Sequence, residues 1–490
     1  MTSQIKKRWQ NYVDSEWVDG STGETIPVTD PATGEQIAQV ARATPDDVDR
    51  AVAAAREAFN RRTLYDMRPA QRGELMLEVA RIFKEIADEV ALVDCLDSGR
   101  TLAGGRNEAM AAARYFTYYG GAIAQFEGKS IPLGDGYVDY TINTPFGVSA
   151  QIVPWNFPLQ IGARSVVCAL ATANTVVLKT PELCPLSLAM LGEACERAGV
   201  PRGCVNIICG YGHDTGAALA VHPDVDHIVF TGSVATGRNI LHAAAERIIP
   251  CVMELGGKSA AIAYPDANPA QVVGSSAVGI FSHAGQVCSA QSRLVVHKSI
   301  HDQIVDGLVE KSKALTIGPG LEDHDLGPLI SEKQLDKVEG YCMAGEQAGA
   351  TALTGGRRCD MEGYFMQPTI FVDAKPDMTI AQEEIFGPVM AVIPFEDREE
   401  AVEIANGTDY GLCAGVYTKD LETAHWTADR LSAGQVFINE WFAGGMETPF
   451  GGTKRSGYGR EKGVEALLNY VQTKNVAVKL GAGAGGRPGG

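Results

Sequence analysis

The sequence GVSAQIVPWN, residues 147–156, is the first of five short apolar runs in the central part of the chain; the others are TVVLK (175–179), CVNIICG (204–210), DHIVFTG (226–232) and SAAIAY (259–264). Helical patterns follow these runs, as in PLSLAMLGEACERAG (185–199). Short apolar strands that alternate with helices are typical of parallel βαβ units, whose ligands collect at the carboxyl ends of the strands. We therefore predict an α/β fold with a ligand site at that edge.

The regions on either side of this core have different patterns. Residues 45–124 carry apolar residues at helical spacing and predict a helical layer. The turn-rich stretch 128–147 predicts a hairpin. A second α/β series is expected over about 268–457, and NYVQTKNVAVKL (469–480) alternates as an exposed edge strand does. Both the hairpin and this strand look like lone pieces, which are equally compatible with pairing between subunits and with a solvated edge.

Composition restricts the class of protein. The chain has 490 residues, 45% of them hydrophobic, and a formal charge of −18. A length of this order predicts roughly three domain-sized units, and the negative charge disfavours nucleic acid as a partner. The amino-terminal residues lack an apolar run, so we expect a cytoplasmic protein without a membrane segment. The cysteines have no CxxC spacing, which predicts neither a metal site nor a disulfide framework.

Three residues are candidates for covalent chemistry. Cys288, in FSHAGQVCSAQSR, lies among small and polar residues and is expected to be accessible, although a buried inert cysteine is the commoner case. Glu254 ends an apolar strand and is either a general base or a strand-end cap. Asn156, in PWNFP, can direct its amide at a developing oxyanion or serve only as a turn residue.

Two further clusters suit a nucleotide. Lys179 ends a predicted strand and Glu182 follows it closely, so the pair can donate to and accept from ribose hydroxyls. The segment VFTGSVATG places Gly232 and Ser233 at a strand-to-helix turn, where backbone N–H groups can bind a pyrophosphate. The chain has no GxGxxG fingerprint in this region, so this second signal is weak when taken alone.

Taken in order, these clusters resemble the aldehyde dehydrogenase superfamily of the hydrolytic, non-acylating kind. The most specific matches are MELGGKS (253–259), GQVCSA (285–290) and EEIFGPV (383–389), and the resemblance covers essentially the whole chain apart from the glycine-rich tail. It implies that Cys288 is the nucleophile, Glu254 the general base and Asn156 part of the oxyanion hole. It also implies NAD as the cofactor, with NADP possible, held by Pro154, Trp155, Lys179, Glu182, Gly212, Gly232, Ser233, Leu255, Glu384 and Phe386.

The resemblance also implies the domain organisation. It gives a Rossmann-like NAD-binding domain at 1–126 and 147–256 and an α/β catalytic domain at 257–457. A small β oligomerisation part is expected at 127–146 and 458–480, followed by a flexible tail at 481–490. A homo-oligomer, either a dimer or a tetramer, is the expected state.

The substrate is expected to be a small-molecule aldehyde. Arg164, eight residues beyond Asn156, resembles an arginine of succinic semialdehyde and lactaldehyde dehydrogenases, which favours a polar or anionic aldehyde such as a semialdehyde. The alternative is that Arg164 pairs with an internal carboxylate, and an aromatic or simple aliphatic aldehyde then fits as well. The implied tunnel residues are Phe157, Gln160, Arg164, Ser282, Val287, Ser289, Trp441, Phe442 and Phe450.

Three rival functions remain from the sequence. A non-redox thioester or ester hydrolase needs no dinucleotide site, so the Lys179, Glu182 and Ser233 clusters disfavour it. A coenzyme-A-acylating enzyme is disfavoured by Glu254, because acylating relatives typically lack this base. A non-catalytic binding protein of the same fold is disfavoured by the joint presence of Cys288, Glu254 and Asn156.

Overall fold

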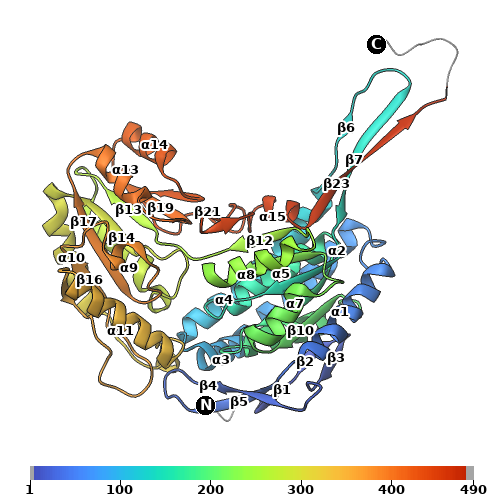
Figure 1. The fold of residues 1–490 in the computed structure, drawn as a ribbon, viewed down its shortest axis with the longest axis horizontal. Coiled ribbons are helices and arrows are strands. Elements are labelled where there is room, and N and C mark those ends of the chain that lie inside the picture. The colour runs from blue at the N-terminus through green and yellow to red at the C-terminus, as the bar shows by residue number, and fades with distance from the viewer. Residues whose placement is uncertain (1–4, 482–490) are drawn as a thin grey trace.

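In the computed structural model, residues 5–481 are described. Apart from Gly481, the predicted flexible tail therefore lies outside the described residues. Figure 1 shows two α/β lobes side by side and a small sheet that projects away from them. The α/β fold class predicted from the alternating runs is confirmed. Within the described range, no helix has both the length and the apolar character that crossing a bilayer requires.

The first lobe is built on an eight-stranded sheet with the order β22-β12-β11-β8-β9-β10-β2-β3. Its central strands are parallel and are buried on both faces, which explains why they read as continuous apolar runs. The antiparallel strands lie at the edges. The bounds are β2 (Asn11–Val13), β3 (Glu16–Val18), β8 (Val148–Ile152), β9 (Thr175–Thr180), β10 (Val205–Cys209), β11 (His227–Thr231), β12 (Cys251–Glu254) and β22 (Gly457–Tyr458).

Helices pack on both sides of this sheet, and the helical layer predicted over 45–124 is present. It is divided into α1 (Pro45–Asn60), α2 (Pro69–Glu85), α3 (Ala87–Ser98) and α4 (Leu102–Ala122). α1 begins at a proline, and Asp47 reaches back to accept from the backbone N–H of Thr44 at 3.0 Å. The remaining helices of the lobe are α5 (Pro158–Ala171), α6 (Leu186–Arg197), α7 (Ala217–Val221) and α8 (Val234–Ala245).

The second lobe contains a seven-stranded sheet with the order β15-β16-β17-β14-β13-β19-β20, in which only β15 is antiparallel to its neighbour. The run SAAIAY forms β13 here and not in the first sheet, because the chain crosses to the second lobe after Glu254 and pairs with β14 and β19. The strands are β13 (Ala260–Ala263), β14 (Arg293–His297), β15 (Thr351–Thr354), β16 (Thr369–Val372), β17 (Val389–Phe395), β19 (Cys413–Tyr417) and β20 (Gln435–Ile438). Its helices are α9 (Pro269–Phe281), α10 (His301–Ala314), α11 (Glu332–Gln347), α12 (Thr379–Gln382), α13 (Arg398–Asn406) and α14 (Leu421–Arg430).

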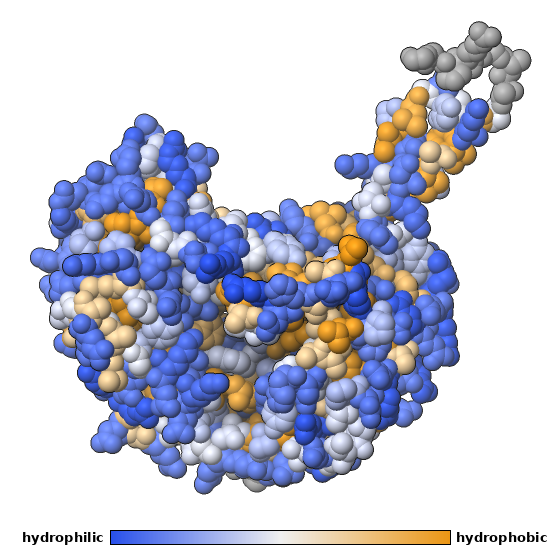
Figure 2. All heavy atoms as spheres, viewed as in Figure 1, coloured by the Kyte–Doolittle hydropathy of each residue, from blue (hydrophilic) through white to orange (hydrophobic). Residues whose placement is uncertain are grey.

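The projecting sheet consists of β6 (Ser130–Ile131), β7 (Tyr137–Pro145) and β23 (Val471–Lys479). The two segments that looked like lone strands pair with each other in antiparallel register, from Val471 opposite Pro145 to Lys479 opposite Tyr137. Apolar side chains gather on this arm (Figure 2), and those at least a third exposed are Ile131, Leu133, Tyr137, Val138, Tyr140, Val478 and Leu480. Smaller pieces complete the fold: β1 (Arg8–Trp9), β4 (Thr25–Thr29), β5 (Gln36–Ala41), β18 (Tyr410–Gly411), β21 (Thr453–Lys454) and α15 (Glu465–Leu468).

Candidate active site

Two cavities meet at Cys288. The first, which we call the strand-end cavity, has a volume of about 220 Å³ and is lined by Pro154, Trp155, Thr231, Gly232, Ser233, Glu254, Leu255, Gly256, Cys288, Gln334, Lys337, Glu384 and Phe386. The second, the α5 cavity, has a volume of about 340 Å³ and is lined by Tyr115, Phe157, Gln160, Ile161, Arg164, Thr231, Glu254, Ser282, Val287, Cys288, Ser289, Phe442, Phe450 and Lys462. Both cavities include Thr231, Glu254 and Cys288, so a group in either one has access to the same thiol and carboxylate.

The Cys288 thiol lies in the loop that follows α9, beyond a short turn in which His283 and Ala284 adopt positive φ. Burial raises the pKa of Cys288 to about 12, and the nearby carboxylates of Glu384 and Glu254 add to the rise. The free thiol is therefore neutral near pH 7, and a thiolate must be generated by loss of its proton to a base.

Glu254 supplies a carboxylate beside that thiol. It ends β12 and is 2% exposed, and neither carboxylate oxygen has a hydrogen-bond partner within the described part of the chain. Burial raises the pKa of Glu254 to about 8. A carboxylate with no fixed partner and a pKa near neutrality is suited to accept and release a proton in the cavity.

The Asn156 side chain is fixed next to the cysteine loop. Its Nδ2 donates to the carbonyl of Gln286 at 3.0 Å, two residues before Cys288. The Asn156 carbonyl accepts from the Arg100 guanidinium, which is itself ion-paired with Asp94 at 2.8 Å. Both charges of that pair are buried. The amide is thus fixed against the segment that precedes Cys288, although it does not line either cavity.

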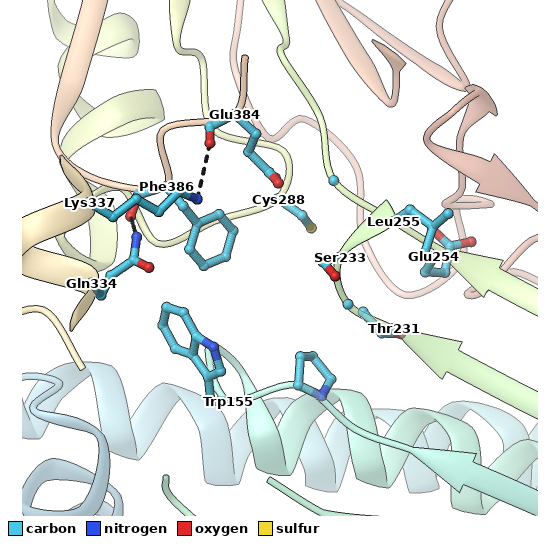
Figure 3. Close-up of a pocket in the computed structure, with 13 residues that line it drawn as sticks. Trp155, Thr231, Ser233, Glu254, Leu255, Cys288, Gln334, Lys337, Glu384 and Phe386 are labelled. Carbon is cyan, nitrogen blue, oxygen red and sulfur yellow. Dashed lines mark hydrogen bonds between the residues drawn. The ribbon is translucent and has the colours of Figure 1, made fainter. Parts of the chain in front are cut away.

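The far side of the strand-end cavity is formed by the EEIFGPV segment and α11. The Glu384 carboxylate accepts from the Gly257 N–H at 3.1 Å, while Lys337 donates to the Glu384 carbonyl at 3.3 Å and Gln334 to the Phe386 carbonyl at 2.8 Å. Figure 3 shows Phe386 facing Trp155 across the cavity, and their ring centroids are 5.1 Å apart.

The residues of this cavity fit a dinucleotide. Ser233 caps α8 by accepting from the Thr236 N–H, so the positive end of that helix borders the cavity and suits a pyrophosphate. A Cβ at Gly256 would come within 2.3 Å of a Glu384 oxygen, so a larger residue there would displace this carboxylate. Outside the lining, Lys179 Nζ donates to Glu182 at 2.8 Å at the carboxyl end of β9, where both can meet ribose hydroxyls.

The structure places most of the sequence-predicted binding residues around the two cavities. The exceptions for the strand-end cavity are Lys179, near the carboxyl end of β9, Glu182, which follows β9, and Gly212, which follows β10; none of the three lines this cavity. In the α5 cavity the exception is Trp441, which is buried behind the wall with its indole N–H on the Ser289 carbonyl at 3.1 Å. The sequence reasoning missed the following lining residues: Tyr115, Ile161, Thr231, Gly256, Gln334, Lys337 and Lys462.

Arg164 lines the α5 cavity but is not a free cation. Its Nη2 makes an ion pair with Glu461, and the two side chains are only 7% and 2% exposed. The sequence left open whether Arg164 meets a substrate anion or pairs with an internal carboxylate. The structure shows that it pairs with an internal carboxylate.

We expect Arg164→Ala to destabilise the protein by about 3–5 kcal/mol, because the substitution leaves the Glu461 carboxylate buried without its partner. Chemical denaturation followed by circular dichroism measures this loss. The double variant Arg164→Met/Glu461→Leu is expected to recover most of it, since it removes both charges. A loss below about 1 kcal/mol for Arg164→Ala would show that the pair is dispensable.

The chain is similar to known proteins over nearly its whole length. Residues 17–476 match the family model "Aldehyde dehydrogenase family". An aldehyde dehydrogenase of Aspergillus niger is 42% identical over 96% of this chain and 95% of its own length, and the mitochondrial benzaldehyde dehydrogenase of Antirrhinum majus is 40% identical over 96% and 88%. Among solved structures, the NAD+ complex of an aldehyde dehydrogenase from Bacillus cereus has a TM-score of 0.95 at 40% identity, covering 97% of each chain.

Proposed function

This chain belongs to the aldehyde dehydrogenase family, and we propose that it oxidises a polar or anionic aldehyde to a carboxylic acid with NAD as hydride acceptor. The observation that carries the proposal is the junction of two cavities at Cys288 and Glu254. One cavity presents groups suited to a dinucleotide, and the other leaves space for a small aldehyde against the same thiol.

The cofactor occupies the strand-end cavity in this proposal. The positive end of α8 at Ser233 faces the pyrophosphate, Lys179 and Glu182 hold the adenosine ribose, and Glu384 holds the nicotinamide ribose beside Phe386. The carboxylate of Glu182 opposes a 2′-phosphate, which favours NAD over NADP, although the ion-paired Lys179 softens this preference. When bound, the nicotinamide supplies the hydride acceptor.

The chemistry of the chain's own residues then follows. Cys288 gives up its proton to a base and its sulfur adds to the aldehyde carbonyl, forming a thiohemiacetal whose oxyanion the Asn156 amide and the Cys288 N–H stabilise. Loss of hydride converts this adduct into a thioester. Glu254 then takes a proton from water, whose oxygen attacks the thioester and releases the carboxylic acid and the thiol.

The substrate class is the finer part of the proposal. The α5 cavity combines the aromatic rings of Phe157, Phe442 and Phe450 with cationic side chains, and such a wall suits a short carbon chain with a negative terminus. An aromatic aldehyde is the second candidate substrate, because one relative of this chain is a benzaldehyde dehydrogenase.

A panel assay tests the function. The rate of NAD reduction is measured with succinic semialdehyde, glycolaldehyde, propanal, benzaldehyde and betaine aldehyde, and the best aldehyde is repeated with NADP. We expect NAD-dependent turnover that is fastest with the anionic aldehyde and slowest with the cationic one. Absence of turnover with every aldehyde, by protein that binds NADH, would contradict the proposal. A lead of benzaldehyde would instead support the aromatic candidate.

We also propose that the protein is a homo-oligomer assembled through the projecting sheet. Val138 and Leu133 on this arm are 46% and 53% exposed, and β6 and β23 leave unpaired edges. We expect Leu133→Lys/Val138→Lys to lower the mass measured by light scattering during size-exclusion chromatography. Leu421→Lys, at a position 72% exposed on α14, is the matched control and should leave the mass unchanged. An unchanged mass for the double variant would place the subunit contact elsewhere.

A further inference from the structure

Lys462 is a cation in the α5 cavity that differs from Arg164 in having no acidic partner. It lines the cavity, and its Nζ lies 5.1 Å from the centroid of the Phe450 ring, in the same wall. Among residues 5–481, no carboxylate forms an ion pair with it. The neighbouring Glu461 is engaged by Arg164 instead.

The charges around the cavity leave this cation uncompensated. Glu461 is paired with Arg164 and is therefore not available to Lys462. Because burial raises the pKa of Glu254 to about 8, this carboxyl is largely neutral near pH 7. Burial, followed by the charge of Arg164, lowers the pKa of Lys462 to about 8, so its ammonium group still keeps its proton near neutrality. A mostly buried ammonium is costly unless an anion joins it.

The backbone holds Lys462 in place. Its φ is +61°, a conformation that a non-glycine residue adopts only when its surroundings enforce it. Two backbone hydrogen bonds join Glu461 to Phe450, at 2.5 and 2.7 Å, and the Gly463 N–H donates to the Met446 carbonyl at 2.8 Å. The cation and the Phe450 ring are therefore presented together, on a strained but well-fixed segment.

We propose that Lys462 binds the carboxylate of an anionic aldehyde while the carbonyl carbon lies at Cys288, and that it selects substrates bearing a negative charge on the carbon chain. The inference rests on the proposed function. In this inference Lys462 recognises the negative charge of the substrate, whereas Arg164 has a structural role because it pairs with Glu461. The rings of Phe450 and Phe442 contact the carbon chain between the two ends.

The experiment compares two substrates of similar shape, succinic semialdehyde and its methyl ester, in the full-length enzyme. For Lys462→Met we expect kcat/KM for the acid to fall roughly 10- to 100-fold, mostly through KM, because a charge-assisted contact is lost. The value for the ester should change less than about twofold. Lys462→Arg should restore most of the preference for the acid. Lys313→Met, at an exposed position on α10, is the matched control.

A second readout does not depend on turnover. Succinate alone should raise the melting temperature of the wild-type protein and of Lys313→Met, but not that of Lys462→Met. The role of Lys462 would be overturned if Lys462→Met lost kcat/KM equally for the acid and the ester. It would also be overturned if succinate raised the melting temperature of all three proteins equally. Rapid oxidation of neutral aldehydes without any preference for the acid would overturn it as well, while leaving the enzyme's function intact. No oxidation of any aldehyde by NADH-binding protein would overturn the proposed function itself.

Discussion

Cys288→Ala is expected to lower kcat/KM for aldehyde oxidation by roughly 10⁴-fold or more, because the substitution removes the sulfur atom that bonds to the substrate in the proposed mechanism. The measurement is the steady-state rate of NAD reduction with the best aldehyde of the panel. NADH binding, followed by fluorescence, should be preserved, since the thiol lies where the two cavities meet and the proposed cofactor contacts come from other residues.

The control for this variant is Cys359→Ala, which removes a partly exposed thiol outside both cavities. Its activity should equal that of the wild-type enzyme. Iodoacetamide provides a further check. Since burial raises the pKa of Cys288 to about 12, its alkylation in the free enzyme should accelerate steadily as the pH rises from 7 to about 9. Retention of more than about one per cent of the activity by Cys288→Ala would exclude this nucleophile.

Glu254→Gln is expected to reduce kcat by about 10²- to 10⁴-fold through loss of the general base. Rapid mixing with aldehyde and NAD should still give one equivalent of NADH per active site, because the thioester forms once and then persists. Loss of this burst together with turnover would assign the carboxylate to the attack of Cys288 as well. Glu332→Gln, at an exposed position at the start of α11, is the control and should behave like the wild type.

The pH dependence provides a second test of Glu254. A base acts when deprotonated, so wild-type kcat should rise with pH through about 8, and this rise should be absent in Glu254→Gln. The effect on stability has the opposite direction. The raised pKa favours the folded state while the carboxyl is neutral, and this contribution is lost as pH rises from about 4.5 through about 8. Glu254→Gln should therefore gain stability relative to wild type at pH 9 but not at pH 4.

The sequence predicted which reactive side chains lie together better than it predicted the rest of the lining of the site. Cys288 and Glu254 lie in long, specific segments, and the structure brings the two into one cavity. The lining residues Gln334 and Lys337 were missed because they lie on α11, whose ordinary amphipathic pattern does not indicate a ligand. Their position is decided by how α11 packs against the EEIFGPV segment, which no local pattern reveals.

The same limit applies to the fold. The buried strands of the first sheet were predictable because parallel strands covered on both faces have continuous apolar runs. SAAIAY has the same pattern, and only its pairing with β14 and β19 assigns it to the second sheet. Likewise, the sequence left open whether Arg164 pairs with a carboxylate of the protein or with an anionic substrate. The structure shows that it pairs with Glu461, which is almost 300 residues away in the sequence and could not be identified from a local pattern.

The adjacency of Glu461 and Lys462 has a consequence for how this enzyme can diverge. The first residue of the two is bound to the scaffold through Arg164, whereas the second projects its charge into the cavity without a structural partner. If Lys462 has the proposed role, a single codon change at position 462 would exchange one class of aldehyde for another without breaking an ion pair. A change at position 461 alone would leave the buried Arg164 without its partner, so position 461 can change only together with Arg164.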